Sequence, residues 1–337
     1  MKKFSLSFCF LILFGLLAIF NCNYSQEVFA DNLQGDGSLA SPYIISSVED
    51  FNYVASQINA GNSNYITTNY KLINELNFNN TTFQGLGNET NKFQGVFDGG
   101  GNTLKNVKIN VDASTSADYG IFNYTYNATI KNLAVEIEYI FESEDTNNSN
   151  INIGGIVGNG INTTITNCKV VNSLYAFDNE TQTKTKANIY SNLTFGGIVG
   201  TSEGISVHDC YALVEFSCEQ YGNSLISSYF GGIVGRANGG EIYNVYVAPT
   251  QQTISSLTGV IADKENMYLY INNASFANVY FGGIAGYVSG RNFTMFNTLF
   301  IGYLKANNSV AYGGLIGKLH SSETLMPLSA KITQSMY

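Results

Sequence analysis

Carboxylates gather at one place in this 337-residue chain, and they are the residues best suited to chemistry. Five of them lie close together: Glu136, Glu138, Glu142, Glu144 and Asp145. Alternate residues of a strand point to the same face, so Glu136 and Glu138 share one side. With the acidic loop that follows, they could supply oxygen ligands to Ca²⁺ or a carboxylate pair for hydrolysis. The simpler interpretation is a solvated strand edge whose charges discourage edge pairing. Apart from calcium at this place, no cofactor is expected.

Asp98 is a further candidate carboxylate, because it stands in the glycine-rich run from Phe97 to Asn102. Polysaccharide-cleaving β-helices also use Asp-Gly-rich turns, but an Asx-type turn that leads into glycines with positive φ explains the run more simply. His208 is predicted to be an outward-facing surface residue. No Ser or Cys has a nearby histidine that would activate a nucleophile. The sequence therefore favours a binding protein over an enzyme.

Cysteine usage allows one disulfide at most in the exported chain. Cys9 and Cys22 fall in the amino-terminal segment, and Cys168, Cys210 and Cys218 remain, an odd number that makes no disulfide framework. Cys168 and Cys210 occupy the same position of the repeat described below. If one repeat is one coil they stack about 4.8 Å apart, within bonding range, whereas two coils per repeat would separate them. The favoured interpretation is a pair of small buried hydrophobes.

Composition and charge restrict the class of protein. Charged residues make up only 12% of the chain, and β-branched and aromatic residues alternate with Gly and Asn, which is typical of an all-β fold. A net charge of −9 with only 16 basic residues argues against nucleic acid and anionic membrane surfaces as partners.

The amino terminus predicts export. Lys2 and Lys3 precede an uncharged apolar run from Phe4 to Phe20, and Val28-Phe29-Ala30 offers a cleavage site before Asp31. An uncleaved anchor is the alternative, although the run is short for a membrane span. We expect a secreted or cell-surface protein that contacts a membrane only through this segment if it stays uncleaved.

A glycine-rich repeat must position all these residues. It reads Gly-Gly-Ile-Val-Gly or a close variant five times, with a worn copy at Tyr119–Asn123. Its glycines are Gly154, Gly155 and Gly158, Gly196, Gly197 and Gly200, Gly231, Gly232 and Gly235, Gly282, Gly283 and Gly286, and Gly313, Gly314 and Gly317. Copies follow one another at intervals of 42, 35, 51 and 31 residues. Elastic spacing between constant motifs is typical of a solenoid, in which loops grow without disturbing the coils.

A second element follows each motif, as in Ile130–Val135, Ile165–Val170 and Ile242–Val247, with an earlier relative at Leu104–Ile109. Apolar and polar residues alternate in it, which indicates a short strand with one face inward. Its polar residues are predicted to stack as a ladder: Asn106, Asn132, Asn167, Asp209 and Asn244. The alternative is that asparagine merely tolerates turn geometry.

The predicted fold is a parallel β-helix with a short amino-terminal capping helix. Ser47-Val-Glu-Asp50 is a capping-box variant, and Phe51, Val54, Ala55 and Ile58 follow at helical spacing, so a helix over about 48–60 covers the first coil. A β-propeller is less suitable, because the shortest repeat is too small for a four-stranded blade. The inserted segments, at about 141–152, 176–192, 217–228 and 250–276, should leave the coils on one side.

These features resemble the GLUG-motif cell-surface proteins. The resemblance rests on Gly35-Asp-Gly-Ser, Pro42-Tyr-Ile-Ile, the segment Phe93–Asn106 and the five glycine motifs, which span nearly all of the exported chain. It implies a right-handed β-helix with an adhesin-like role. Some relatives carry a metallopeptidase domain, but His208 and His320 do not form its His-Glu-x-x-His zinc motif.

The expected organisation is a signal peptide at 1–30, a cap with the first coils at 31–112, and the repeat β-helix at 113–337. The expected function is non-enzymatic adhesion or ligand binding through loops on one side, with a protein or glycan of a host or neighbouring cell as partner. A carbohydrate-active β-helix enzyme and a structural spacer or truncated surface protein are the alternatives.

Overall fold

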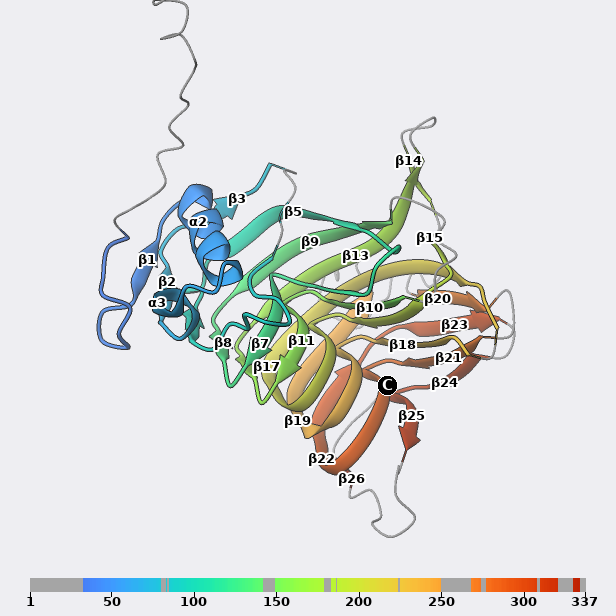
Figure 1. Cartoon of the computed structure of the whole chain (residues 1–337). Coiled ribbons are helices and arrows are strands. Elements are labelled where there is room, and N and C mark those ends of the chain that lie inside the picture. The colour runs from blue at the N-terminus through green and yellow to red at the C-terminus, as the bar shows by residue number, and fades with distance from the viewer. Residues whose placement is uncertain are drawn as a thin grey trace, which may run out of the picture. The chain divides into compact units, whose positions relative to one another are not determined.

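The computed structural model describes residues 33–79, 83, 85–141, 149–178, 183–185, 187–223, 225–249, 268–273, 277–307, 310–320 and 330–333. All of them belong to one compact unit. Parallel strands pair coil upon coil, as Figure 1 shows, and the helices lie beside the first strands. The predicted all-β parallel β-helix is confirmed. No boundary between compact units falls near residue 112, and the predicted signal peptide lies outside the described residues.

Each coil of the glycine repeat begins with a strand of a six-stranded sheet, bends at the glycine motif, and continues through the second, larger sheet. In the six-stranded sheet the strands are β6 (Ala117–Tyr119), β10 (Asn150–Gly154), β16 (Asn192–Gly196), β18 (Ser227–Gly231), β21 (Asn278–Gly282) and β24 (Val310–Gly313). Beyond the bend they continue as β7 (Phe122–Tyr126), β8 (Thr129–Lys131) and β9 (Ala134–Phe141), as β11 (Val157–Ile161), β12 (Thr164–Thr166) and β13 (Lys169–Asp178), and as β17 (Val199–Gln220), β19 (Val234–Pro249), β22 (Ala285–Phe300), β25 (Ile316–His320) and β26 (Ala330–Thr333).

One repeat is one coil. Gly154 pairs with Gly196, which pairs with Gly231, and the same register continues through Gly282 to Gly313. The worn copy keeps the register too, since Tyr119 pairs with Ile153 and Phe122 with Val157. The intervals between motifs vary from 31 to 51 residues without changing this register.

None of the motif glycines in the described chain has positive φ, so these positions do not need glycine for its backbone freedom. They need it because a side chain would not fit there. A Cβ on the second glycine would face the core: at Gly232 it would overlap the carbonyl of Gly283 and the side chain of Val247. A Cβ on the third glycine would face outward against the preceding coil: at Gly286 it would lie 2.6 Å from Phe230 N. The motif is therefore a point of close approach between the backbones of successive coils.

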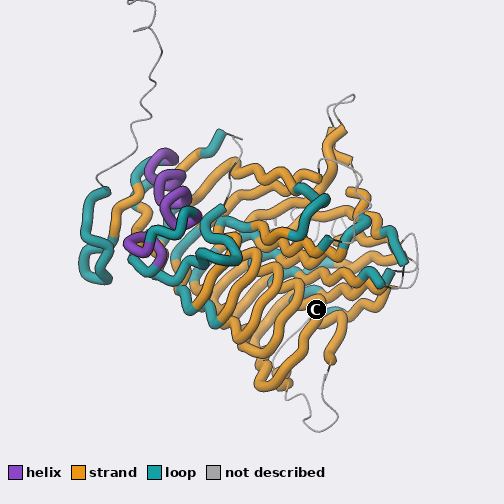
Figure 2. Tube along the Cα trace, in the orientation of Figure 1, coloured by secondary structure: helices purple, strands orange, loops and turns teal. Residues whose placement is uncertain are grey.

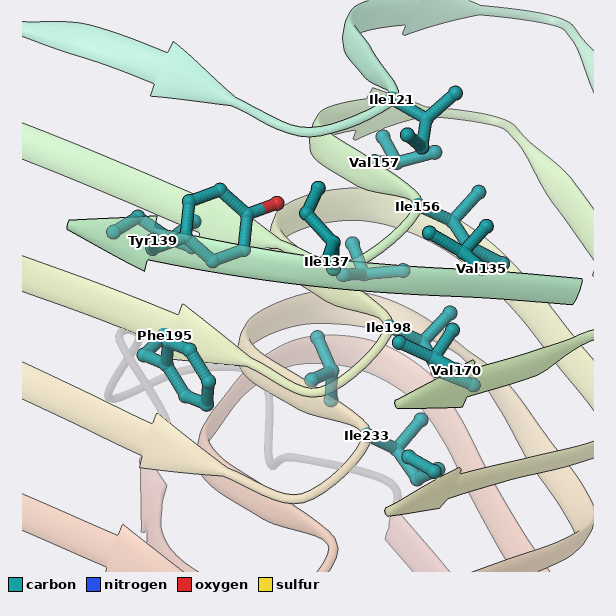
Figure 3. Close-up of a cluster of buried hydrophobic side chains, with 14 of the residues drawn as sticks. Ile121, Val135, Ile137, Tyr139, Ile156, Val157, Val170, Phe195, Ile198 and Ile233 are labelled. Atoms are coloured by element: carbon teal, nitrogen blue, oxygen red, sulfur yellow. The ribbon is translucent and has the colours of Figure 1, made fainter. Parts of the chain in front are cut away.

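The apolar residues of the motif form the core. Ile156, Ile198, Ile233 and Ile284 are fully buried and occupy equivalent positions in successive coils. Figure 3 shows Ile156, Ile198 and Ile233 one above another, with Val135 and Val170 facing them from the opposite wall. Stacking of identical side chains buries apolar area in every coil, which is the main favourable term in the fold.

Asparagine and glycine make the sharper corners. Asn127 and Asn162 have φ of 50° and 47°, and Gly204 and Gly239 continue this corner with φ of 63° and 71°. Asn is one of the few residues other than Gly that adopts this left-handed region readily. The strands β17, β19 and β22 therefore pair again beyond their corners, with a register shift between β19 and β22 at Asn238 and Gly240.

The capping helix is confirmed as α2 (Val48–Asn59). Ser47 accepts from Asp50 N at 3.1 Å, and Asp50 Oδ2 accepts in return from Ser47 N at 3.1 Å. Phe51, Val54, Ala55 and Ile58 are buried as predicted. The helix precedes α3 (Ser63–Ile66) and accompanies β1 (Tyr43–Ile45), β2 (Tyr70–Leu72), β3 (Leu76–Asn77), β4 (Val96–Asp98) and β5 (Thr103–Val111) at one end of the described fold (Figure 2).

The described parts of the inserted segments lie between the end of one coil and the first strand of the next, and their exit on one side stays a prediction. They are not wholly loops, because β15 (Ala187–Ile189), the end of β17, β20 (Tyr268–Asn273) and β23 (Tyr303–Asn307) pair in parallel. One insertion forms a hairpin between β13 and β14 (Thr183–Thr185). Within the described residues, no helix is long and apolar enough to cross a membrane.

Candidate ligand-binding surface

The predicted asparagine ladder exists. Asn167 Nδ2 donates to Asn132 Oδ1 at 2.7 Å, and Asn244 Nδ2 donates to Asp209 Oδ1 at 2.9 Å. Asn132, Asn167, Asp209 and Asn244 all have φ between 51° and 55°. Both interpretations offered by the sequence, a ladder and tolerance of turn geometry, therefore apply. The corner requires a residue with left-handed backbone conformation, and the side chain of that residue then forms a hydrogen bond to the next coil.

Asn106 does not belong to this ladder, which corrects the prediction. Its strand β5 pairs Leu104 with Val135, so Asn106 lies beyond the corner and donates to Asn77 Oδ1 at 2.9 Å instead. The ladder begins at Asp98, whose Oδ1 accepts from Asn132 Nδ2 at 2.9 Å, and it ends at Asn297, which donates to Asn244 at 2.7 Å.

Asp98 also forms the predicted Asx-type turn. Gly100 N donates to Asp98 Oδ1 at 3.0 Å, and Gly100 and Gly101 have positive φ. Hydrogen bonds from Asn132 and Gly100, together with Lys131, lower the pKa of Asp98 although partial burial opposes this. Its carboxylate therefore stabilises the turn and the ladder.

His208 is more enclosed than a free surface residue. Its ring stacks on Tyr243 with centroids 4.6 Å apart, and Tyr243 stacks on Phe296 at 4.8 Å. Its Nδ1 lies 2.7 Å from Asp209 Oδ2. The residue is on the outer face, as predicted, within an aromatic column one position before the ladder.

The structure describes only part of the acidic cluster. Glu136 and Glu138 lie on the outer face of β9, and Glu138 Oε2 accepts from Tyr175 Oη at 2.8 Å. Glu142, Glu144 and Asp145 fall outside the described residues. Among the residues that are described, no group of three or more His, Cys, Asp or Glu side chains could hold a metal. Calcium at this place stays a prediction.

Cys168 and Cys210 stack in neighbouring coils but remain free thiols, so the disulfide alternative is wrong in this structure. Each sulfur points to a backbone carbonyl two residues before it, Thr166 O at 3.2 Å and His208 O at 3.0 Å. Cys168 N also donates to Cys210 Sγ at 3.3 Å. The favoured interpretation as small buried side chains is confirmed, and Cys218 is likewise buried and free.

A depression of about 380 Å³ lies beside the ladder on the outer face of the large sheet. Asn132, Asn167 and Glu136 line it, and Lys169 lies over the ring of Tyr211 at 5.5 Å. Its polar lining could contact a ligand, although Lys169 is its single positive charge.

A second surface lies at the glycine bend near the carboxyl end. We call it the bend cluster: Tyr229 of β18, Arg236 of β19, Tyr280 of β21, Tyr287 of β22 and Lys318 of β25. Register places Tyr229 beside Tyr280 before the bend, and Arg236, Tyr287 and Lys318 in one column after it. The strands that carry these residues lie together in Figure 1.

The outer faces on the two sides of the bend meet in this cluster. Tyr229 and Tyr280 stack with centroids 5.5 Å apart, and Tyr229 reaches across the bend to Tyr287 at 4.9 Å. Tyr287 is held between two cations, with Arg236 at 5.6 Å and Lys318 at 5.9 Å from its ring. Only small backbone groups fit inside the bend, so the motif glycines allow these side chains to converge.

Both cations of the bend cluster lack a carboxylate partner within the described part of the chain, where ion pairs are found at Lys105 and Lys131. Lys318 Nζ donates to Tyr280 Oη at 2.9 Å and lies 4.3 Å from its ring centre. This hydrogen bond raises the pKa of Lys318, which stays charged. Rings attract cations without neutralising them, so the cluster presents net positive charge.

The amino end of the same two columns is different. Asp118 lies three coils before Tyr229 and accepts from Asn152 Nδ2 at 2.7 Å. Burial raises its pKa, although hydrogen bonds from Asn152 and Asn159 oppose the shift. Lys92 lies over the neighbouring ring of Tyr124 at 4.9 Å. The columns therefore run from a partly buried carboxyl group to the exposed Arg236 and the half-buried Lys318.

Sequence reasoning missed the bend cluster, although a signal for it exists. Tyr229 and Tyr280 stand two residues before a glycine pair, while Arg236, Tyr287 and Lys318 each follow the third glycine of a motif. Aligning the motifs would have placed them in two neighbouring columns.

Comparison with known proteins adds no assignment. No family model matches the chain, and searches of curated proteins and of solved structures found no significant match.

Proposed function

We propose that this chain is a secreted or cell-surface, non-enzymatic β-helix protein that binds an external ligand through the bend cluster. The observation that carries the proposal is the convergence on neighbouring strands of three tyrosines with two cations that have no carboxylate partner among the described residues. Tyrosine and arginine are the side chains that contribute most to binding surfaces. Strands hold such residues more precisely than loops do.

The described carboxylates of the predicted sites support binding over catalysis. The Asp98 carboxylate accepts hydrogen bonds from Asn132 and Gly100 and forms an ion pair with Lys131. The Glu138 carboxylate accepts a hydrogen bond from Tyr175. The predicted export signal and the resemblance to GLUG-motif surface proteins support a location outside the cell. The bend cluster also differs from the inserted loops first expected to bind, which lie partly outside the described residues.

An array of glycans and extracellular-matrix proteins, probed with and without Ca²⁺, tests the proposal. We expect retention of a ligand by the purified chain and its loss in a Tyr229→Ser/Tyr280→Ser variant. Tyr126→Ser is the matched control, because Tyr126 is an outward tyrosine, 39% exposed, away from the bend cluster. Failure to retain any ligand, or equal retention by the double variant, would contradict the proposal.

A polysaccharide lyase or hydrolase is a second candidate function, and one observation favours it. Asp118 is a partly buried carboxyl with a raised pKa next to Tyr124, as catalytic acids often are. Incubating acidic and neutral polysaccharides with the wild type and with Asp118→Asn separates the functions. Release of shorter chains by the wild type alone would replace the binding proposal with an enzyme.

A further inference from the structure

We infer that the bend cluster binds a linear acidic polysaccharide, with Arg236 and Lys318 contacting successive anionic groups along the chain. This inference rests on the proposed function and adds the class of ligand. Its starting point is the charge of the surface. In a protein with 16 basic and 25 acidic residues, two cations that form no ion pair with the described residues occupy one column.

Spacing selects an extended polymer over a small anion. Arg236 pairs with Tyr287, and Tyr287 pairs with Lys318, so the cations are two coils apart. Two strand spacings amount to about 9.6 Å, too far for both cations to bind one carboxylate. One sugar unit of an extended chain advances by about one coil, so anionic groups on alternate sugars match the cations.

The rings fix the cations in place. Tyr287 is only 9% exposed and lies between Arg236 and Lys318, while Tyr280 Oη accepts from Lys318 Nζ at 2.9 Å. Side chains held in this way lose little conformational freedom when they bind. Arg236 remains exposed, so its guanidinium can donate two parallel hydrogen bonds to a carboxylate or sulfate.

The rest of the column suits hydroxyl groups. Toward the amino end, Arg236 is followed in register by Thr201 and Asn159, which are half-buried polar residues on the outer face. A sugar chain that passes the cations meets these hydrogen-bonding side chains next. The net charge of −9 opposes a polyanion, but salt limits that repulsion to about 8 Å under physiological conditions.

Titration calorimetry of the purified chain tests the inference with four probes. Hyaluronan carries carboxylates alone, dextran sulfate carries sulfates alone, chondroitin sulfate carries both, and dextran is neutral. We expect binding of at least one acidic polymer, weakening with added salt, and no binding of dextran. Which acidic probes bind then distinguishes carboxylate from sulfate recognition.

Charge variants locate the site. Arg236→Gln and Lys318→Gln should each weaken binding about tenfold, since each removes a charge-assisted contact. Lys169→Gln is the matched control, because Lys169 is also an exposed cation over a tyrosine but lies on the other surface. Circular dichroism and melting temperature confirm that each variant is folded.

Three results would overturn the inference: no acidic polymer binds, dextran binds equally well, or Lys169→Gln weakens binding as much as the bend variants. If the array ligand still depends on Tyr229 and Tyr280, the proposed function survives this failure. If the array also shows no ligand that depends on these tyrosines, both the inference and the proposed function are wrong.

Discussion

Asn244 donates to Asp209 at 2.9 Å, but the Asp209 carboxylate has no hydrogen with which to continue the ladder to Asn167. Its other oxygen lies 2.7 Å from His208 Nδ1. Asparagines on both sides of this coil continue the ladder, through Asn167 to Asn132 and through Asn297 to Asn244. One residue thus divides the ladder and ties it to the aromatic column of His208 and Tyr243.

Asp209→Asn should make the protein less sensitive to acid. Hydrogen bonds from His208 and Asn244 lower the pKa of Asp209. A carboxylate with a lowered folded pKa stabilises the fold above its unfolded pKa, about 3.9, and this contribution is lost as the pH falls through the folded value. Asparagine does not titrate, so the melting temperature of the variant relative to wild type should rise on acidification. A constant difference between about pH 6 and pH 3 would contradict this.

Asp118→Asn should show the opposite trend. Burial raises the pKa of Asp118, so its effect on stability is most favourable below the unfolded pKa and is lost as the pH rises through the folded value. Asparagine can still accept from Asn152 and carries no charge to desolvate. We expect the variant to melt above wild type at neutral pH and at the same temperature in acid. A variant that melts lower at neutral pH would show that the carboxylate is required there.

Gly197→Ala should destabilise the fold by at least about 2 kcal/mol, because overpacking a tight interior forces the backbone to move. A Cβ at Gly197 would overlap the carbonyl oxygen of Gly232 and lie 2.8 Å from Val214 Cγ1. Gly160→Ala is the control, since its Cβ would meet only side chains, the nearest being Val157 Cγ1 at 3.3 Å. Urea unfolding of both variants gives the comparison. Equal stabilities would show that the motif glycines are not required sterically.

The sequence predicts the coils well because interior positions are constrained. Gly154, Gly196 and Gly231 must recur wherever the backbone of one coil touches the next, so their register is visible without a structure. The register of the first coils is harder to predict from the sequence. Leu104–Ile109 has the same alternation as Ile130–Val135, yet it pairs with β9, and this moved Asn106 out of the ladder.

The outer surface could not be predicted in the same way. Tyr229 and Lys318 are 89 positions apart in the sequence, and their places beside a glycine motif relate them only once the motifs are aligned coil by coil. Their proximity follows only from stacking three coils in register. Residues on the outside are also free of packing constraints, so their pattern emerges only after the inward positions have been aligned.

The buried thiols should resist modification. Burial raises the pKa of Cys168, and burial also keeps the Cys218 thiol protonated. Only the thiolate reacts readily, and these sulfurs lie in the core. In the chain that starts at Asp31, a maleimide should leave Cys168, Cys210 and Cys218 unlabelled under native conditions and label all three in denaturant. Intact mass detects both states. Only one label in denaturant without reductant would reveal a Cys168–Cys210 disulfide, and rapid native labelling would contradict their burial.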